Sequence, residues 1–153
     1  AVQIAKAYGA HVTAVASGKN ERFVRSLGAD SFINYETTSF ESLHRSWQIM
    51  FDVAGTHRFL QIKHILAKHG RYVTTEPDLA NYASRLMTAF STMHNSVIIA
   101  KPKRKDLGEL VRLIRRGQLR VCVEDVQPLN EAHTIHRQLE HGGHRGKYVL
   151  EVS

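Results

Sequence analysis

The chain has 153 residues, of which 42% are hydrophobic and 23% are charged, a composition typical of one soluble globular domain. Every apolar run is shorter than the roughly 20 residues that a membrane-spanning helix needs, so we expect no membrane partner. The single cysteine, Cys122, excludes an internal disulfide and favours a reducing compartment, and we predict a cytoplasmic protein.

The formal net charge of +7 suits a nucleic-acid surface, a phosphate-bearing small ligand or simple solubility. Part of this charge lies in one basic run, residues 101–105 (KPKRK). Charge runs are usually solvated, and no aromatic residue interleaves this one, as a stacking platform for single strands requires. We therefore predict a solvated loop here and keep nucleic-acid binding as an alternative.

Residues 1–35 predict a helix, a strand, a second helix and a second strand. Residues 1–8 have helical apolar spacing, and Ala1 has no capping residue before it, so we expect this helix to begin upstream. Residues 11–16 (HVTAVA) are typical of a strand covered on both faces. Asn20 is a suitable N-cap for the next helix, and residues 31–35 form the next strand. This order predicts a parallel crossover unit.

The rest of the sequence continues the alternation of helices and strands. The pattern predicts helices over residues 37–46, 57–68, 82–90, 106–116 and 128–141, and strands over residues 48–54, 71–75, 97–100, 120–126 and 147–152. The inward face of the second of these helices is Phe59, Ile62, Ile65 and Leu66, while Asp106 and Glu109 have the spacing of a capping box. Such alternation predicts an α/β fold with a doubly wound parallel sheet.

The glycine-rich phosphate fingerprint of such sheets, GxGxxG, is absent from this sequence. It lies between the first strand and the first helix of the fold, a position that precedes Ala1 in this chain. We therefore expect a Rossmann sheet that lacks its first strand and its glycine loop.

Several motifs follow one another along the whole chain: AVQIAKAYGAHVTAVAS, RSLGAD and FINY within residues 1–35, FDVAG (51–55), GRYVTT (70–75), and residues 106–152 with Pro128-Leu129 and Gly146-Lys147. In this order they resemble the cofactor domain of the medium-chain dehydrogenase/reductase superfamily, in its quinone-oxidoreductase-like and zinc-type alcohol-dehydrogenase-like branch. The resemblance implies a truncated NAD(P)-binding Rossmann domain over residues 1–118. Residues 119–153 would then be a C-terminal segment that completes the catalytic domain in full-length members.

The resemblance leaves the catalytic residues unknown, because complete members carry them in an N-terminal domain. It also implies that the strands at residues 120–126 and 147–152 lack native neighbours, so we expect exposed edges or altered pairing there.

The loop after the first strand favours NADPH over NADH. NAD-specific sites place an Asp or Glu after the second Rossmann strand, which residues 11–16 would form in a sheet that lacks its first strand. That carboxylate binds the ribose 2′-hydroxyl and repels a 2′-phosphate. This loop reads Ser17-Gly18-Lys19-Asn20, without a carboxylate, and Ser17 with Lys19 suits a phosphate. The resemblance adds Tyr35, whose counterpart reaches the 2′-phosphate in similar members. The alternative is that Lys19 is a solvated lysine and Tyr35 an ordinary strand-end residue.

Other candidate cofactor residues lie at strand ends, where parallel sheets bind nucleotides. The alternative is that they form plain turns and routine edge hydroxyls. These candidates are Asp52, Ala54 and Gly55 after the third strand, and Thr74 and Thr75 at the end of the fourth. The resemblance adds Lys147, which matches a family GK pair with Gly146.

No metal site is predicted. The histidines include His133 and His136 at i, i+3 spacing, but neither an HExxH motif nor a cysteine pair is present, so zinc is not expected in this segment. The resemblance also implies a function. This chain would be the NADP-binding portion of an oxidoreductase that reduces small-molecule quinones, enones or carbonyls by hydride transfer, and we expect the fragment itself to be inactive. The resemblance further implies a homodimer through the edge strand Val97–Ala100. The alternative is a non-catalytic dimerisation module or a basic nucleic-acid-binding domain.

Overall fold

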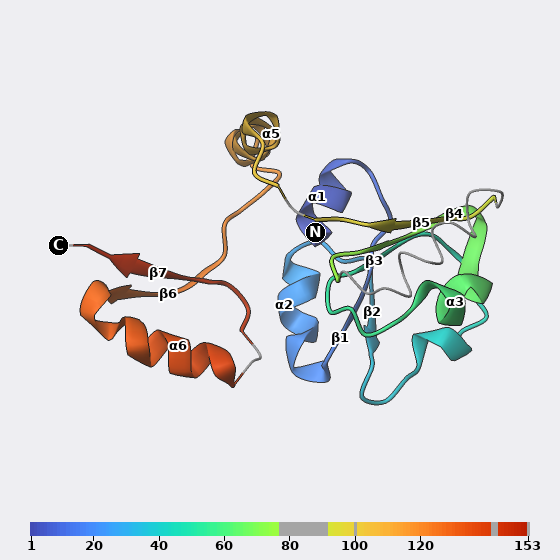
Figure 1. Ribbon diagram of the computed structural model, residues 1–153, viewed down its shortest axis with the longest axis horizontal. Helices are drawn as coiled ribbons and strands as arrows, with labels where there is room; N and C mark the ends of the chain where they lie inside the picture. The colour runs from blue at the N-terminus through green and yellow to red at the C-terminus, as the bar shows by residue number, and fades with distance from the viewer. Residues whose placement is uncertain (77–91, 100, 142–143, 153) are drawn as a thin grey trace. The chain divides into compact units, whose positions relative to one another are not determined.

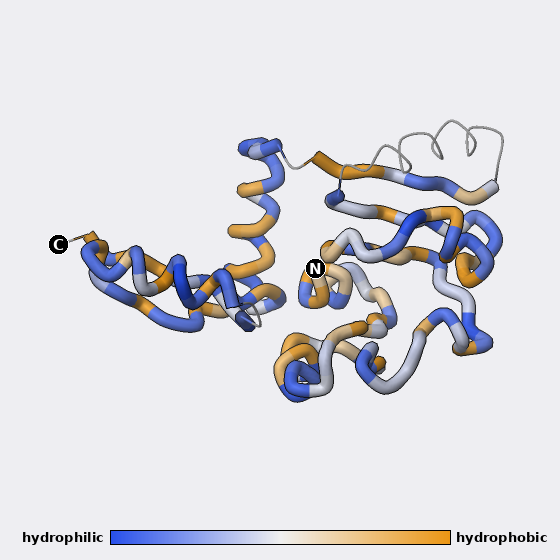
Figure 2. The backbone as a smooth tube through the Cα atoms, turned by 60° about the horizontal axis from the view of Figure 1, so that its bottom comes forward, coloured by the Kyte–Doolittle hydropathy of each residue, from blue (hydrophilic) through white to orange (hydrophobic). Residues whose placement is uncertain are grey.

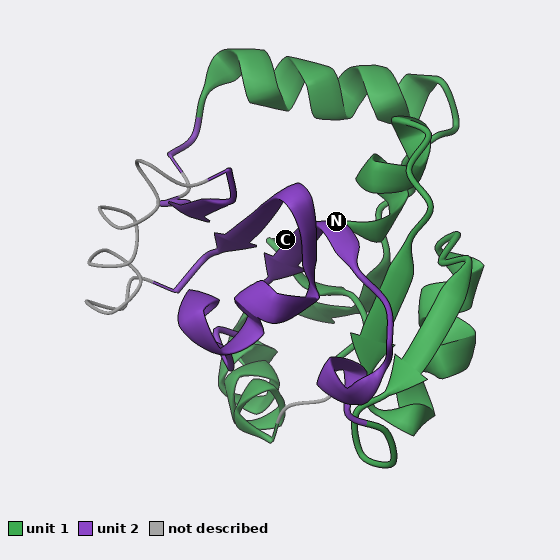
Figure 3. Ribbon diagram, turned by 90° about the vertical axis from the view of Figure 1, so that its right-hand side faces the viewer, with its two compact units in different colours: residues 1–38, 103–153 green, residues 39–102 purple. Residues whose placement is uncertain are grey.

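The computed structural model describes residues 1–76, 92–99, 101–141 and 144–152. It contains two compact units, residues 1–38 with 103–153 and residues 39–102, which Figure 3 colours separately. The predicted helix over residues 82–90 lies outside the described residues. The boundary at residue 118 stays a prediction.

The first unit contains two pairs of parallel strands (Figure 1). β1 pairs with β2 in a register that runs from Thr13↔Ser31 to Ala16↔Asn34, and β6 pairs with β7. Its elements are α1 (Val2–Ala7), β1 (Thr13–Ala16), the 3₁₀ turn Gly18–Asn20, α2 (Glu21–Ser26), β2 (Ser31–Asn34), α5 (Arg104–Arg115), β6 (Val123–Pro128), the 3₁₀ turn Leu129–Glu131, α6 (Ala132–Glu140) and β7 (Lys147–Glu151).

The second unit contains a three-stranded parallel sheet in the order β3-β4-β5. Its elements are the 3₁₀ turn Phe40–Ser42, β3 (Trp47–Asp52), α3 (Phe59–Ile62), the 3₁₀ turn Lys63–Ile65, β4 (Leu66–Thr74) and β5 (His94–Val97). All strand pairs in the described ranges are parallel, and the predicted α/β class is confirmed.

The core of the second unit consists of the predicted inward residues together with one tyrosine. Ile62 and Tyr72 are fully buried, and they cluster with Phe59, Ile65 and Leu66. The helix itself is shorter than predicted, because Leu66 already pairs with Trp47 in the parallel ladder of β4 and β3. Strand pairing therefore overrides the helical periodicity of the last turn.

The helix predicted over residues 37–46 is wrong. Only the 3₁₀ turn Phe40–Ser42 forms there. Two hydroxyls of the segment bond to nearby backbone instead: Thr37 Oγ1 donates to the Asn34 carbonyl oxygen at 3.4 Å, and Ser42 Oγ donates to the Ser39 carbonyl oxygen at 2.8 Å. Such local bonds compete with helix formation.

Besides β4, which begins at Leu66 rather than at residue 71, two more strands lie away from their predicted positions. β5 begins at His94 rather than Val97, because residues 94–97 pair in register with residues 71–74 of β4. β6 covers residues 123–128 rather than 120–126, since it pairs with β7 over this range. In the described part of the chain β6 and β7 have only each other as neighbours, so the expected exposed edges are present.

The capping box predicted at Asp106 is wrong. α5 begins at Arg104, its N-cap is Lys103, and no side chain caps it. Glu109 instead pairs with Arg112 and accepts a hydrogen bond from the Tyr8 hydroxyl at 2.6 Å. The basic run is therefore partly helical rather than entirely a loop.

α5 also carries an apolar stripe, which Figure 2 shows as recurring hydrophobic bands along the helix. Its exposed members are Leu107, Val111 and Ile114.

No helix among the described residues is both long and apolar enough to cross a membrane.

A carboxylate just before β2 connects this strand to α1 and to the segment before β1. Lys6 Nζ lies 2.8 Å from Asp30 Oδ1, and the Val12 N–H donates to Asp30 Oδ2 at 2.7 Å. These hydrogen bonds, the one from Lys6 first, lower the pKa of Asp30 from 3.8 to about 2. Because the folded-state pKa lies below the unfolded one, the stabilisation is present above about pH 4 and is lost as the pH falls through about 2.

Replacing Asp30 by asparagine is expected to make the free energy of unfolding less sensitive to acid between about pH 4 and pH 2. Urea unfolding followed by circular dichroism across this range measures the effect, with Asp106→Asn as the control for losing one exposed carboxylate. The same acid dependence in Asp30→Asn and in the original chain contradicts the assignment.

Candidate functional site

The loop after β1 is ordered by hydrogen bonds among its own residues. Ser17 is 5% exposed, and its hydroxyl accepts a hydrogen bond from Asn20 Nδ2 at 3.1 Å. The Asn20 N–H donates to the Ser17 carbonyl oxygen at 2.9 Å. Asn20 is the N-cap of α2, as predicted, but its side chain makes no capping hydrogen bond, because its Oδ1 accepts from Arg145 Nε instead. Ser17 therefore orders the turn in which Lys19 is exposed.

A carboxylate outside the predicted set lies against this loop. Glu36 Oε2 accepts a hydrogen bond from the Gly18 N–H at 2.9 Å, and the Glu36 N–H donates to Asn34 Oδ1 at 3.0 Å. The strand register contains the signal: Ala16 pairs with Asn34, so Gly18 and Glu36 each lie two residues past paired strand ends. Residues 17–20 contain no carboxylate themselves, but the Glu36 carboxylate lies against them.

The predicted residues Lys19 and Tyr35 lie at the same pair of strand ends. Tyr35 directly follows β2, and its N–H donates to the Ala16 carbonyl oxygen at 3.3 Å. The Tyr35 side chain is 60% exposed. Among the described residues, neither the Lys19 ammonium nor the Tyr35 hydroxyl makes a hydrogen bond or ion pair. Both groups are therefore accessible to a ligand.

The C-terminal segment of the same unit reaches this loop. Arg145 Nη2 donates to the Lys19 carbonyl oxygen at 2.8 Å, and Arg145 Nε donates to Asn20 Oδ1 at 3.2 Å. Lys147, the predicted residue of this segment, is the exposed first residue of β7, and its N–H donates to the Cys122 carbonyl oxygen at 2.7 Å. The guanidinium of Arg145, which is not among the predicted site residues, makes the side-chain contacts with the loop.

In the second unit, Asp52 organises the turn that ends β3. Its Oδ1 accepts from the Gly55 N–H at 2.8 Å, and its Oδ2 accepts from the His57 N–H at 3.2 Å. The Tyr72 hydroxyl lies 3.0 Å from Asp52 Oδ2 and 2.6 Å from the His57 carbonyl oxygen. Burial first, and then the Asp52 charge, raise the pKa of Tyr72, so this hydroxyl stays a neutral donor. Ala54 is exposed in the same turn.

The turn brings predicted residues from the ends of β3 and β4 together. Gly55 has a φ of 65°, and a Cβ there would lie 2.6 Å from Glu76 Cβ, so the position requires glycine. The Thr75 hydroxyl donates to the Val53 carbonyl oxygen at 3.2 Å. Thr74 is fully buried, whereas Thr75 is exposed, so Thr75 is the threonine that a ligand can reach.

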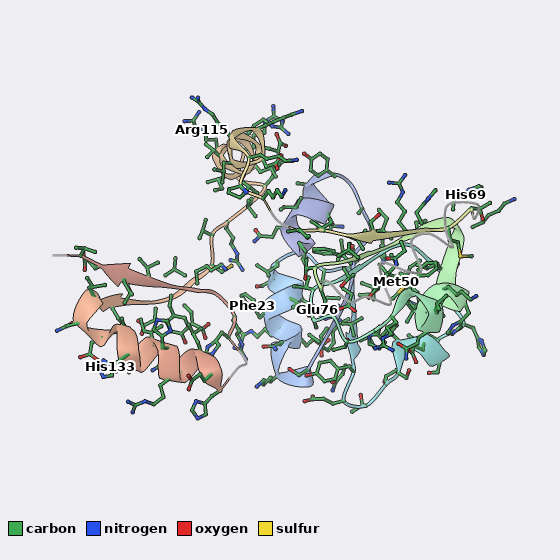
Figure 4. All side chains as sticks on the ribbon, in the orientation of Figure 1. Phe23, Met50, His69, Glu76, Arg115 and His133 are labelled. Atoms are coloured by element: carbon green, nitrogen blue, oxygen red, sulfur yellow. The ribbon has the colours of Figure 1, made fainter. Side chains whose placement is uncertain are left out.

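Three histidines of the C-terminal segment, His133, His141 and His144, bond to their own segment rather than to one another. His133, labelled on α6 in Figure 4, has its Nδ1 3.3 Å from the Asn130 carbonyl oxygen. The rings of His144 and Tyr148 meet edge to face at 5.4 Å. Within the ranges that the structure describes, no group of three or more His, Cys, Asp or Glu side chains is placed to hold a metal ion.

Residues 27–150 match the sequence model of a family described as zinc-binding dehydrogenase. The chain is 27% identical to the chloroplast envelope quinone oxidoreductase homolog of Arabidopsis thaliana, with 99% of this chain and 48% of that protein covered. It is 29% identical to the mitochondrial NAD(P)H oxidoreductase of Mus musculus, with 99% of this chain and 44% of that protein covered.

Among solved structures, the quinone oxidoreductase from Coxiella burnetii is similar to this chain with a TM-score of 0.83 and 27% identity. That match covers 99% of this chain and 48% of the other. The chain therefore spans about half the length of the relatives that it matches.

Proposed function

Because this chain belongs to the zinc-binding dehydrogenase family, within the medium-chain dehydrogenase/reductase proteins that its motifs resemble, we propose that it forms part of the cofactor-binding region of an NADPH-dependent oxidoreductase. The relatives are named as quinone and NAD(P)H oxidoreductases, which supports the oxidoreductase class and a nicotinamide cofactor. The NADPH preference rests on one observation, the exposed Lys19 whose carbonyl oxygen the Arg145 guanidinium binds. Two cations with the exposed Tyr35 hydroxyl suit a ribose 2′-phosphate.

The exposed groups of each unit fit a different part of the proposed role. In the first unit, the turn that Ser17 orders would hold the ribose phosphate through Lys19 and Tyr35. In the second unit, Ala54 and Thr75 are the exposed predicted residues at the ends of β3 and β4. When bound, the nicotinamide supplies the hydride. The described side chains do not fit a zinc ion, and no step is assigned to zinc.

Thermal unfolding of the chain in the presence of NADPH or NADH tests the proposed cofactor. A ligand that binds only the folded state raises the unfolding midpoint in proportion to its occupancy. We expect a larger increase with NADPH than with NADH at equal concentration. Equal increases, or none with either cofactor, contradict the proposal.

Glu36 is expected to reduce the preference for NADPH, because its carboxylate binds the Gly18 N–H next to the proposed phosphate position. Replacing Glu36 by glutamine keeps the size of the side chain and removes the charge. We expect NADPH affinity to rise roughly fivefold, since like charges repel but solvent screens an exposed site. Isothermal titration with NADPH and NADH measures the change, and Glu21→Gln on α2 serves as the charge control. An equal change for both cofactors contradicts this role.

The proposed substrates are quinones, enones or carbonyls, in keeping with relatives named quinone oxidoreductase. A chain of these 153 residues spans about half of such relatives, so we expect no turnover from it alone. NADPH oxidation followed at its absorbance band, with a soluble quinone or enone added, is the measurement. Quinone-dependent oxidation above the rate without protein contradicts this expectation.

We also propose a homodimer through the edge of the β3-β4-β5 sheet. Within the described residues β5 pairs on one side only, with β4, and the neighbouring Ile98 and Ile99 are exposed. Sedimentation of Ile99→Lys, which places a charge at this edge, should show fewer dimers than the original chain.

We propose that the protein is located in the cytoplasm. The relatives above are named as chloroplast and mitochondrial proteins, so cell fractionation is the test of this location.

A further inference from the structure

We propose that Arg145 is a positioning residue for the 2′-phosphate site, and that it acts through the Lys19–Asn20 turn. This inference rests on the proposed function, because it assigns a role to one more residue of the same site. Two hydrogen bonds from the Arg145 guanidinium, of 2.8 Å and 3.2 Å, join the C-terminal segment to this turn.

The backbone of Arg145 is fixed by β6. The N–H groups of Arg145 and Gly146 both donate to Glu124 Oε2, at 2.7 Å and 3.1 Å. A Cβ on Gly146 would lie 2.6 Å from the Cys122 carbonyl oxygen, so this close approach requires glycine. The Glu124 carboxylate thus binds backbone N–H groups, and the Arg145 guanidinium is directed to the loop.

The guanidinium fixes the turn from which Lys19 projects. Both ends of the Asn20 amide are in use, since its Oδ1 accepts from Arg145 and its Nδ2 donates to the buried Ser17. Arg145 Nη2 also holds the Lys19 carbonyl oxygen, so the Lys19 side chain starts from a restrained backbone.

Arginine is the side chain that this arrangement requires. Arg145 donates through Nε and Nη2 of one planar guanidinium to two acceptors of the turn at the same time. A lysine lacks the planar fork and cannot make the Nε and Nη contacts together. Replacing Arg145 by lysine therefore preserves the charge and removes the geometry.

Adenosine 2′,5′-bisphosphate and adenosine 5′-monophosphate are suitable probes, because they differ only in the 2′-phosphate. Isothermal titration of the chain with each probe should show that Arg145→Ala weakens the bisphosphate about tenfold and leaves the monophosphate unchanged, because the charge-assisted contact of Lys19 with the 2′-phosphate then starts from an unrestrained turn. Arg145→Lys should weaken the bisphosphate as well, by a smaller factor. Arg137→Ala, which removes one exposed positive charge from α6, is the control.

The outcomes separate this inference from the proposed function. If the original chain binds both probes equally, the proposed NADPH preference fails and this inference fails with it. If the original chain prefers the bisphosphate but Arg145→Ala behaves like Arg137→Ala, only the inference is overturned. Equal weakening of both probes by Arg145→Ala and Arg145→Lys shows a general structural role and also overturns it. If Arg145→Lys keeps the original preference for the bisphosphate, the planar geometry of arginine is not needed, and the inference is overturned.

Discussion

Replacing Lys19 by alanine is expected to lower the preference for NADPH over NADH by roughly tenfold to a hundredfold, because hydrogen bonds to charged groups contribute about 1.5–3 kcal/mol. The Lys19 ammonium is exposed and, among the described residues, makes no hydrogen bond or ion pair that would compete with a phosphate. NADH lacks the 2′-phosphate, so its affinity should stay the same. Dissociation constants for the two cofactors, measured at fixed ionic strength, give the ratio.

A second lysine variant separates this local effect from the net charge of the chain. Lys105 is exposed on α5 in the same unit, and Lys105→Ala removes the same charge from a different element. We expect Lys105→Ala to leave the NADPH/NADH ratio unchanged. If both variants lower the ratio equally, the effect comes from overall electrostatics, and the assignment of Lys19 is wrong.

Replacing Asp52 by alanine is expected to lower the free energy of unfolding by about 3 kcal/mol, because two half-buried N–H donors lose their acceptor together, at roughly 1–3 kcal/mol for each donor that water does not reach. The Asp52 carboxylate accepts from the Gly55 and His57 N–H groups and lies 3.0 Å from the Tyr72 hydroxyl. Its side chain is 13% exposed, so water replaces these bonds poorly. Urea unfolding followed by circular dichroism measures the loss.

Graded variants show which of these contacts carries the effect. Asp52→Asn keeps one acceptor oxygen and should have an intermediate stability. Tyr72→Phe removes only the hydroxyl and should cost about 1 kcal/mol, since the Asp52 turn keeps its two backbone donors. Asp106→Ala on α5 is the control for the loss of an exposed carboxylate. Asp52→Ala as stable as Asp106→Ala contradicts an organising role for Asp52.

Local periodicity determined the elements whose burial follows from the sequence. Residues 11–16 and 31–35 contain β1 and β2, and Phe59, Ile62 and Ile65 form the core as their spacing predicts. The prediction that β1 is covered on both faces is wrong, because Val15 is 44% exposed. Periodicity could not decide between a helix and a strand where both would bury the same residue. Leu66 is buried whether it ends a helix or begins β4, and only its pairing with Trp47 decides between them.

For the candidate site as well, the sequence identified residues but did not determine all of their contacts. The sequence identified Ser17, Lys19 and Tyr35 at strand ends, because carboxyl ends of parallel strands are recognisable from local pattern. It also identified Asp52 and Gly55, although the contacts made by Asp52 are those of a turn rather than of a ligand. The cofactor roles of all these residues stay predictions.

By itself, the sequence determined the α/β class and the family resemblance, and it predicted a phosphate-compatible loop after β1, since these depend on residue types and on the order of short motifs. Only the tertiary structure decided which distant groups meet that loop. Glu36 reaches Gly18 because β1 and β2 pair in register, and Arg145 reaches Lys19 across 126 positions because Glu124 fixes its backbone. Sequence periodicity contains no information on contacts between segments so far apart, and those contacts are set by strand register and backbone anchoring.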